Sequence, residues 1–342
     1  MKRILTAAAG LALAGAGLYV FFRGDDTVFQ TLIAEMSGTS AAAVAACLGL
    51  AVVSMWLRAL RLSVMLPDAT DGGALHKRGL FAVTTVSFMI NNILPARLGE
   101  AARVLLLWKR NGFPVAMSIG VLLLERALDV IVYLAFLFVP VLFSPALAAS
   151  LRGINPAVMA VIWFAFAAFA ALIALFTLYA FMPQFFRKAA WRTGALLPAK
   201  AQAAAQKIGA ELESSLGWIF SARKAAAVSA LTVATCSCYA AMLTILVAEW
   251  NSFGILESML AQAFAAFGSA IPLAPGSVGT LHAVLLEGLK IIGIEAGRAR
   301  AVVVLYHGLQ YVVITLLGLL LLAGMGLKFR DITKSPDGPG AP

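Results

Sequence analysis

Three charged residues, Arg97, Glu100 and Arg103, follow Pro95 in a segment that lies between two strongly apolar runs. In a helix that begins after Pro95, Glu100 is three residues from each arginine, so all three side chains are expected to share one face. Two arginines against one glutamate leave a positive charge, and a break at Pro95 and Gly99 frees backbone N–H groups. Guanidinium and N–H groups together bind anions such as phosphate. The pattern predicts an anion site, and mutual neutralisation of the charges is the structural alternative.

A second charged set, Glu125, Arg126 and Asp129, lies in the middle of another apolar run. Arg126 and Asp129 are three residues apart and Glu125 and Asp129 four, which places them on neighbouring positions of a helix. Ionisable groups inside a membrane are costly and are candidates for function. This set carries one net negative charge, so we expect Arg97 or Arg103 to face Glu125 or Asp129. An ion pair between helices and a direct role in substrate binding both fit.

A third polar segment interrupts the apolar sequence near the C-terminal end. Helix-breaking residues cluster there: Pro272, Pro275, Gly276 and Gly279. His282 lies beside this break, and His307 lies in the next apolar run. A histidine in an apolar region is commonly a packing residue, but the position of His282 makes it a candidate substrate ligand. Asn92, just before the first break, belongs to the same predicted site.

The composition indicates what kind of element must position these residues. Of 342 residues, 62% are hydrophobic and only 12% are charged, and the formal net charge is +10. Soluble globular proteins carry roughly 25% charged residues, so this chain is expected to be an integral membrane protein. The basic residues lie mostly at the ends of apolar runs, which indicates membrane orientation and argues against a nucleic-acid partner. No cofactor, metal-binding or catalytic motif is recognised, and the protein is not expected to be an enzyme.

The apolar runs predict an all-α polytopic membrane protein with about six full spans. The expected spans are 4–22, 41–57, 115–140, 157–182, 225–247 and 301–327. Two further stretches, 79–108 and 255–294, are broken by Pro and Gly. The second limb of the first, 101–108, is too short to cross about 30 Å of hydrocarbon at about 1.5 Å per residue. We therefore predict a re-entrant hairpin there and, by analogy, a second one in 255–294.

Positive charge predicts the orientation. With the N-terminus in the cytoplasm, most of the 26 Lys and Arg residues fall on the cytoplasmic side, Arg58 and Arg61 among them. The blocks 41–140 and 225–330 then each contain a helix, a broken hairpin and a helix, in opposite orientations. This is the outline of an inverted repeat, an arrangement that in transporters places the substrate near the bilayer midplane.

One transmembrane domain, 1–330, accounts for nearly the whole chain. It divides into an N-terminal helix and loop (1–40), a first half (41–140), a connecting segment (141–224) and a second half (225–330). The basic, alanine-rich part of the connection is expected to form a helix on the anionic cytoplasmic leaflet, with partner binding as the alternative. The tail 331–342 is expected to be disordered.

Four motifs carry a resemblance to a known family. They are "RALR" at 58–61, "NNILPARLGEAAR" at 91–103, "LLERALDV" at 123–130 and "PLAPGSVGTLH" at 272–282. In this order they resemble the transmembrane region of lysylphosphatidylglycerol synthases, a family of flippase-like membrane proteins, over roughly 40–325. Many relatives have a glutamate where this chain has His282, and the departure resembles a subgroup associated with hopanoid synthesis.

The resemblance implies translocation of a lipid with an anionic or modified head group across the bacterial inner membrane, with both termini cytoplasmic. Expected partners are membrane lipids (a phospholipid, a hopanoid or a polyprenyl glycolipid) and lipid-modifying enzymes. Some relatives carry a soluble aminoacyl-transferase domain, whereas this sequence reaches Pro342 without one, so synthesis of lysyl lipid is not expected. The main alternative is an accessory that scaffolds lipid-modifying enzymes without transporting lipid. A membrane enzyme that transfers a group to lipid is a third reading.

Overall fold

The computed structural model describes residues 28–67, 79–95, 97–152, 199–248, 253–270 and 275–326, with a few isolated positions besides. Every regular element in these ranges is helical. Four helices are long and apolar enough to cross a membrane: α3 (Ala41–Met65), α6 (Val115–Phe143), α11 (Ala222–Ala248) and α14 (Ala296–Gly324). They match four of the six predicted spans. The other two, 4–22 and 157–182, and the tail 331–342 lie outside the described residues.

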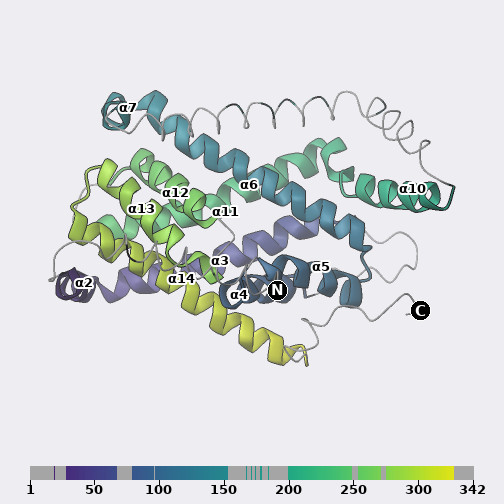
Figure 1. The fold of residues 1–342 in the computed structure, drawn as a ribbon, viewed down its shortest axis with the longest axis horizontal. Helices are drawn as coiled ribbons and strands as arrows, with labels where there is room; N and C mark the ends of the chain where they lie inside the picture. Colours follow the sequence, from purple (N-terminus) through teal and green to yellow (C-terminus); the bar gives the residue numbers. More distant parts are fainter. Residues whose placement is uncertain are drawn as a thin grey trace.

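Shorter helices surround these four, as Figure 1 shows. They are α2 (Val28–Ser37), α4 (Leu80–Ile93), α5 (Leu98–Asn111), α7 (Pro145–Arg152), α10 (Ala199–Ser214), η1 (Gly217–Phe220), α12 (Ile255–Ala270), η2 (Pro275–Ser277) and α13 (Thr280–Ile291). From the basic connecting segment, α10 packs against α6, where Gly120 approaches Ser215 and Leu212. Its placement on the leaflet remains a prediction.

Helix α3 extends beyond its predicted end at residue 57. It begins at the N-cap Ser40, whose hydroxyl accepts the backbone N–H of Ala43, and continues to Met65. The prediction placed Arg58 and Arg61 on the cytoplasmic side, beyond the end of the span, but both lie within α3 and are buried, with exposed fractions of 5% and 0%. The predicted end of the span was wrong because the counter-ions of these arginines lie on another helix, α6, and the hydropathy of α3 alone contains no information about them. Their assignment to the cytoplasmic side stays a prediction.

The first broken stretch forms two packed helices, α4 and α5. Each has 14 residues, about 21 Å at about 1.5 Å per residue, which is short of a full span. The break lies between the end of α4 at Ile93 and the start of α5 at Leu98, and Arg97 takes a left-handed backbone (φ 52°) as the N-cap of α5. Gly99 was expected in the break but lies in the first turn of α5, where it lets the two helices approach closely.

The second hairpin consists of α12 and α13, with η2 between them. Gly276 and Gly279 have positive φ values of 58° and 88°, and Pro275 begins η2, so the break falls where these residues predicted it. Pro272 lies outside the described residues. Entry of either hairpin from one membrane face remains a prediction.

The two halves of the chain pack reciprocally. Helix α3 packs along α11, α4 packs against α14, and α12 packs against α6, so exchanging the halves reproduces the contacts. Helices α3 and α11 are antiparallel, because their contacts pair rising residue numbers on α3 with falling numbers on α11: Cys47 approaches Met242, Ser54 approaches Tyr239, and Arg61 approaches Thr232. A two-fold axis parallel to the helices would make these equivalent helices parallel. Their antiparallel packing is what an inverted repeat requires.

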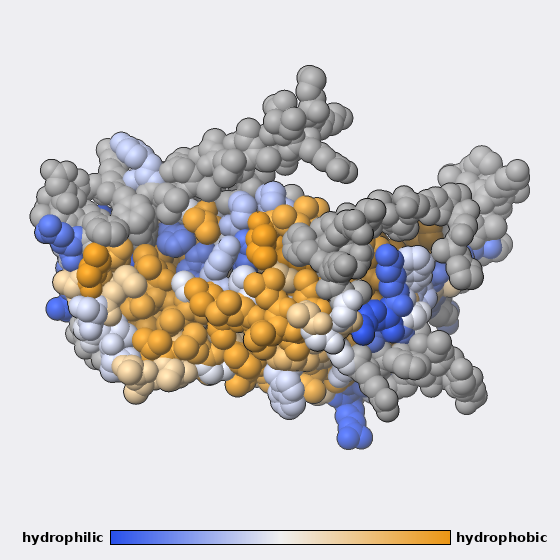
Figure 2. All heavy atoms as spheres, turned by 90° about the horizontal axis from the view of Figure 1, so that it is seen from below, coloured by the Kyte–Doolittle hydropathy of each residue, from blue (hydrophilic) through white to orange (hydrophobic). Residues whose placement is uncertain are grey.

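Apolar side chains fill the interior and also cover much of the outside. Buried clusters join α3 to α11 and α14, the end of α3 to α4 and α5, and α6 to α11 and α12. Exposed large side chains include Leu123 on α6 and Leu320 on α14 (61% and 71% exposed). In Figure 2 hydrophobic residues dominate the middle of the face that is shown. Such a surface suits contact with acyl chains.

The close approach of α4 and α5 gives a first testable prediction. A Cβ on Gly99 would collide with the carbonyl oxygen of Ser87 and lie 2.6 Å from Oδ1 of Asn91. Gly99→Ala should therefore lower the free energy of unfolding by about 1–3 kcal/mol, measured by thermal unfolding in detergent. Gly49→Ala is the control, since Gly49 lies on α3 with nothing within 4 Å, and alanine should stabilise it by about 0.5–1 kcal/mol. Equal unfolding temperatures for Gly99→Ala and the unmodified protein would contradict the packing argument.

Candidate functional site

A buried network of ion pairs links α3, α5 and α6. Asp129 of α6 pairs with Arg58 (3.2 Å) and Arg61 (2.5 Å) of α3, and with Arg126 (3.3 Å) one turn away on its own helix. Arg61 also donates to the hydroxyl of Thr232 on α11 (3.1 Å). The network therefore ties both halves together at the level of Asp129.

Glu125 extends this network to the first hairpin. Its carboxylate lies 2.7 Å from the guanidinium of Arg103 and 3.5 Å from that of Arg61, and all three side chains are at most 4% exposed. The prediction that Arg97 or Arg103 faces Glu125 or Asp129 is confirmed for Arg103 and Glu125. A charge at this depth requires such a partner.

The other prediction about the first hairpin, a common face for its three charges, was wrong. Arg97 precedes the first turn of α5 in a left-handed conformation, so its side chain does not follow the helical spacing. It lies 3.7 Å from Glu100 and donates to the carbonyl oxygen of Ser269 on α12 (2.9 Å). Arg103 points instead into the protein interior, toward α6. The hairpin therefore divides its charges between two places.

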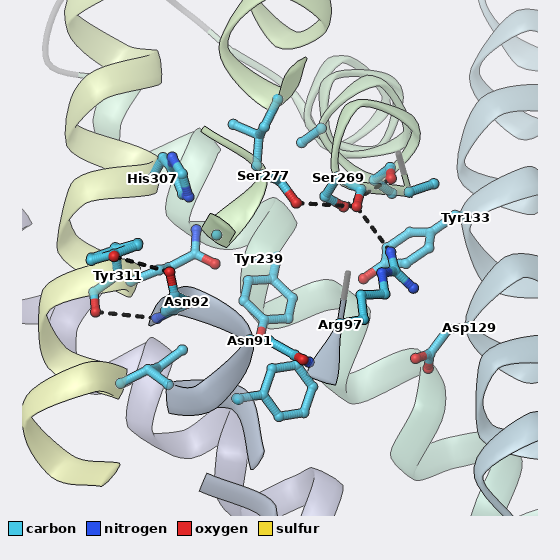
Figure 3. A pocket seen from close by; sticks show the side chains of 18 of the residues that line it. Asn91, Asn92, Arg97, Asp129, Tyr133, Tyr239, Ser269, Ser277, His307 and Tyr311 are labelled. Carbon is cyan, nitrogen blue, oxygen red and sulfur yellow. Dashed lines mark hydrogen bonds between the residues drawn. The ribbon is translucent and has the colours of Figure 1, made fainter. Parts of the chain in front are cut away.

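A cavity of about 320 Å³ lies where the two hairpins meet α6, α11 and α14, and Figure 3 shows it from close by. Five of the eight predicted substrate ligands line it: Asn92, Arg97, Glu100, Arg126 and Asp129. Arg103 and Glu125 lie outside it, in the buried network. His282 does not line the cavity but contacts His307, which does. Arg58 completes the charged lining.

The charges around the cavity leave a positive surplus. The network and the lining contain five arginines (58, 61, 97, 103 and 126) and three carboxylates (100, 125 and 129). In the described part of the chain, Nε of Arg58 and Nε of Arg126 are buried and have no hydrogen-bond partner. A buried donor without a partner is costly, so both groups favour an acceptor in the cavity.

Uncharged polar side chains also line the cavity. They come from α4, α6, α11, α12 and α14, and include Asn91, Tyr133, Tyr239, Gln262, Tyr306, Gln310 and Tyr311. None of these was predicted. They are scattered over five apolar runs, and only helix packing brings them together. The sequence could have indicated Arg58 as a site residue, because "RALR" places two arginines on one face of an apolar helix.

Aromatic rings hold Arg58 in place. Its guanidinium lies 5.0 Å from the ring centre of Phe88 on α4 and 5.6 Å from that of Tyr239 on α11. Contacts at these distances stabilise a buried cation. Ser54 of α3 donates to the hydroxyl of Tyr239 (3.0 Å), which orients that ring. The cation is therefore positioned by both halves of the protein.

Both hairpin breaks are bonded to α14. At the first, Tyr311 donates to the carbonyl of Asn92 (3.0 Å), and the amide of Asn92 donates to Thr315 (3.0 Å). At the second, the N–H of Gly279 donates to Nδ1 of His282 (3.2 Å), and Nε2 of His282 lies 3.5 Å from Nδ1 of His307. In Figure 3 His307 and Tyr311 project from the same helix beside the cavity. The contacts of His282 therefore anchor the break.

These features define a multi-pass membrane protein whose two broken hairpins enclose a charged cavity between similar halves. The family model described as "Lysylphosphatidylglycerol synthase TM region" matches residues 7–318, and the chain belongs to that family. The resemblance inferred from the four motifs is thereby confirmed. No curated protein matched the chain. A membrane function related to lipid is consistent with the family.

Proposed function

We propose that this protein translocates lipids with an anionic head group between the leaflets of a bacterial inner membrane, with both termini in the cytoplasm. The observation that carries the proposal is the cavity at the junction of the two broken hairpins. Its surplus of arginines and the unpartnered donors of Arg58 and Arg126 favour an anion. Binding and movement of lipid are proposed as its whole activity, without chemical change to the lipid. A hopanoid or a polyprenyl glycolipid remains an alternative substrate class.

The size of the cavity supports a head group as the occupant. Small-molecule sites in proteins have volumes of about 300–1,000 Å³, so about 320 Å³ suits a head group and excludes a whole lipid. The acyl chains would remain in the bilayer against the apolar exterior. Inverted halves suit alternating exposure of such a site to the two leaflets.

A scaffold that does not transport lipid is the second candidate, because stabilisation of the fold is enough to explain some of the buried charged residues. Arg103, Glu125 and Arg61 are buried and paired with one another, away from the cavity. The cavity-lining arginines distinguish the two functions, since a scaffold needs no open anion site.

Reconstituted vesicles provide the test. We expect the purified protein to move fluorescent phosphatidylglycerol between leaflets, measured by loss of fluorescence when an impermeant reductant is added outside. Arg97→Lys keeps the charge but loses the planar fork that binds phosphate with two hydrogen bonds. It should slow transport at least about tenfold, a loss of about 1.4 kcal/mol, and leave the unfolding temperature unchanged.

Arg110→Lys is the matched control, since Arg110 is exposed at the end of α5 and bonds only the carbonyl of Met325 (3.4 Å) in the described residues. Its transport rate should equal that of the unmodified protein. Vesicles in which the unmodified protein moves no labelled lipid would refute translocation and support the scaffold.

A further inference from the structure

The carboxylates of the cavity are already occupied by arginines. Asp129 has three guanidinium partners, Arg58, Arg61 and Arg126, and its side chain is 5% exposed. Glu100 lies 3.7 Å from Arg97 at the entrance of α5. An ammonium group in the cavity would have to compete with these arginines for each carboxylate and would meet the positive surplus. The charged wall therefore suits a phosphate and disfavours an amino group on the same lipid.

Four carboxamide side chains line the cavity beside the charged wall. One end of each is held by the protein: Oδ1 of Asn91 accepts the N–H of Gly99 (2.8 Å), and Nδ2 of Asn92 donates to Thr315 (3.0 Å). Oε1 of Gln262 accepts the hydroxyl of Tyr306 (2.7 Å), and the side chain of Gln310 donates to the Tyr306 carbonyl (2.8 Å). These bonds fix the amides in place.

The opposite ends of the four amides remain available to a ligand. An amide has a carbonyl that accepts and an NH₂ group that donates, and the bonds given above use one end of each of these amides. The free ends are two NH₂ groups (residues 91 and 262) and two carbonyls (residues 92 and 310). A hydroxyl group both donates and accepts, so this mixed set suits several neighbouring hydroxyls. In Figure 3 Asn91 and Asn92 lie on the same helix segment, near Tyr239 and Tyr311.

We propose that the substrate is a lipid phosphodiester whose outer substituent is uncharged and carries hydroxyl groups. The cavity-lining arginines (58, 97 and 126), which we call the arginine wall, bind the phosphate. The four amides (residues 91, 92, 262 and 310), which we call the amide wall, bind the hydroxyls. The assignment rests on the proposed function for its biological meaning, but it concerns binding and has its own test. A lipid with a lysyl group on the same phosphate binds more weakly, because its ammonium groups meet occupied carboxylates.

Binding of matched short-chain lipids to the purified full chain tests the assignment. The probes are dioctanoyl phosphatidylglycerol, phosphatidylethanol with the same charge but no hydroxyl, and lysyl-phosphatidylglycerol. We expect phosphatidylglycerol to bind at least about tenfold more tightly than either of the others. Equal affinity for phosphatidylethanol, or tighter binding of the lysyl lipid, would overturn the proposal. Soluble glycerophosphoglycerol should bind far more weakly, and equal affinity would overturn the assignment to a lipid.

Gln310→Met tests the amide wall with little disturbance, because Gln310 is half-buried and its side-chain bonds in the described residues are to Tyr306, one turn away on the same helix. It should reduce affinity for phosphatidylglycerol several-fold and leave that for phosphatidylethanol unchanged. Gln206→Met, at an exposed position of α10 outside the cavity, is the matched control and should change neither. Equal loss for both lipids in Gln310→Met would overturn the role of the amide.

The two proposals fail separately. A protein that prefers phosphatidylglycerol in binding but moves no lipid in vesicles would retain the substrate class and lose translocation. A protein that binds phosphatidylglycerol and phosphatidylethanol with equal affinity, and moves both at the same rate, would support translocation and contradict the proposed substrate class.

Discussion

Asp129→Asn should lower the free energy of unfolding by about 3–5 kcal/mol, because it removes the shared counter-ion of three arginines in the interior. Arg58 and Arg61 are 5% and 0% exposed, and both depend on Asp129 as a counter-ion. Asparagine has nearly the same shape, so the loss comes from charge and not from packing. Thermal unfolding in detergent and the amount of folded protein in the membrane measure the effect.

An exposed carboxylate provides the control for Asp129. Glu287 pairs with Lys290 at 2.9 Å, but the two side chains are 54% and 43% exposed. Glu287→Gln should therefore change stability by less than about 1 kcal/mol. If Asp129→Asn were as mild as Glu287→Gln, the buried network would not stabilise the fold as we infer.

Arg126→Gln should weaken head-group binding roughly ten- to a hundredfold while the protein remains folded. A hydrogen bond to a charged group contributes about 1.5–3 kcal/mol, and every 1.4 kcal/mol is about tenfold in affinity. Arg126 lines the cavity with a side chain that is 29% exposed, and Asp129 keeps Arg58 and Arg61 when Arg126 is removed. Binding of dioctanoyl phosphatidylglycerol and the unfolding temperature are the two measurements.

Arg103→Gln is the informative comparison, because it removes an arginine that the sequence had placed in the same site. Arg103 is paired with Glu125 and is not part of the cavity lining. Among the described residues its loss leaves Glu125 with only the 3.5 Å contact to Arg61, so the free energy of unfolding should fall. Any Arg103→Gln protein that remains folded should bind lipid nearly as the unmodified protein does. Equal loss of lipid binding in both folded variants would contradict the division between cavity and network.

Several features of the site could be predicted from the sequence because they depend on nearby residues. The i,i+3 spacing of Arg126 and Asp129 on a continuous apolar run predicted their ion pair. Pro275, Gly276 and Gly279 predicted the second break, since such residues interrupt a helix wherever they occur. The net negative charge of the set that contains Glu125 and Asp129 predicted an arginine partner from the first hairpin, which is Arg103, but not the partners Arg58 and Arg61 on α3.

The wrong predictions have one physical cause. A local sequence pattern does not contain the positions of residues that contact it from other parts of the chain. Arg58 ended the predicted span because its charge seemed to need water, yet Asp129, on another helix, neutralises it at depth. Gly99 was assigned to the break because glycine interrupts helices, yet the close approach of Ser87 explains it. Arg97 was placed on the face of Arg103 because its left-handed backbone could not be foreseen.

By itself, the sequence determined that this is a helical membrane protein of the lysylphosphatidylglycerol synthase transmembrane family with two interrupted segments. Hydrophobic run length, proline and glycine decide those features residue by residue. Only the tertiary structure decided which charges are structural and which line a cavity. It also gathered Asn91, Gln262 and Gln310 from three helices into one wall. A lone amide in an apolar run has no visible purpose until packing brings others beside it, because a binding site is a property of distances between segments.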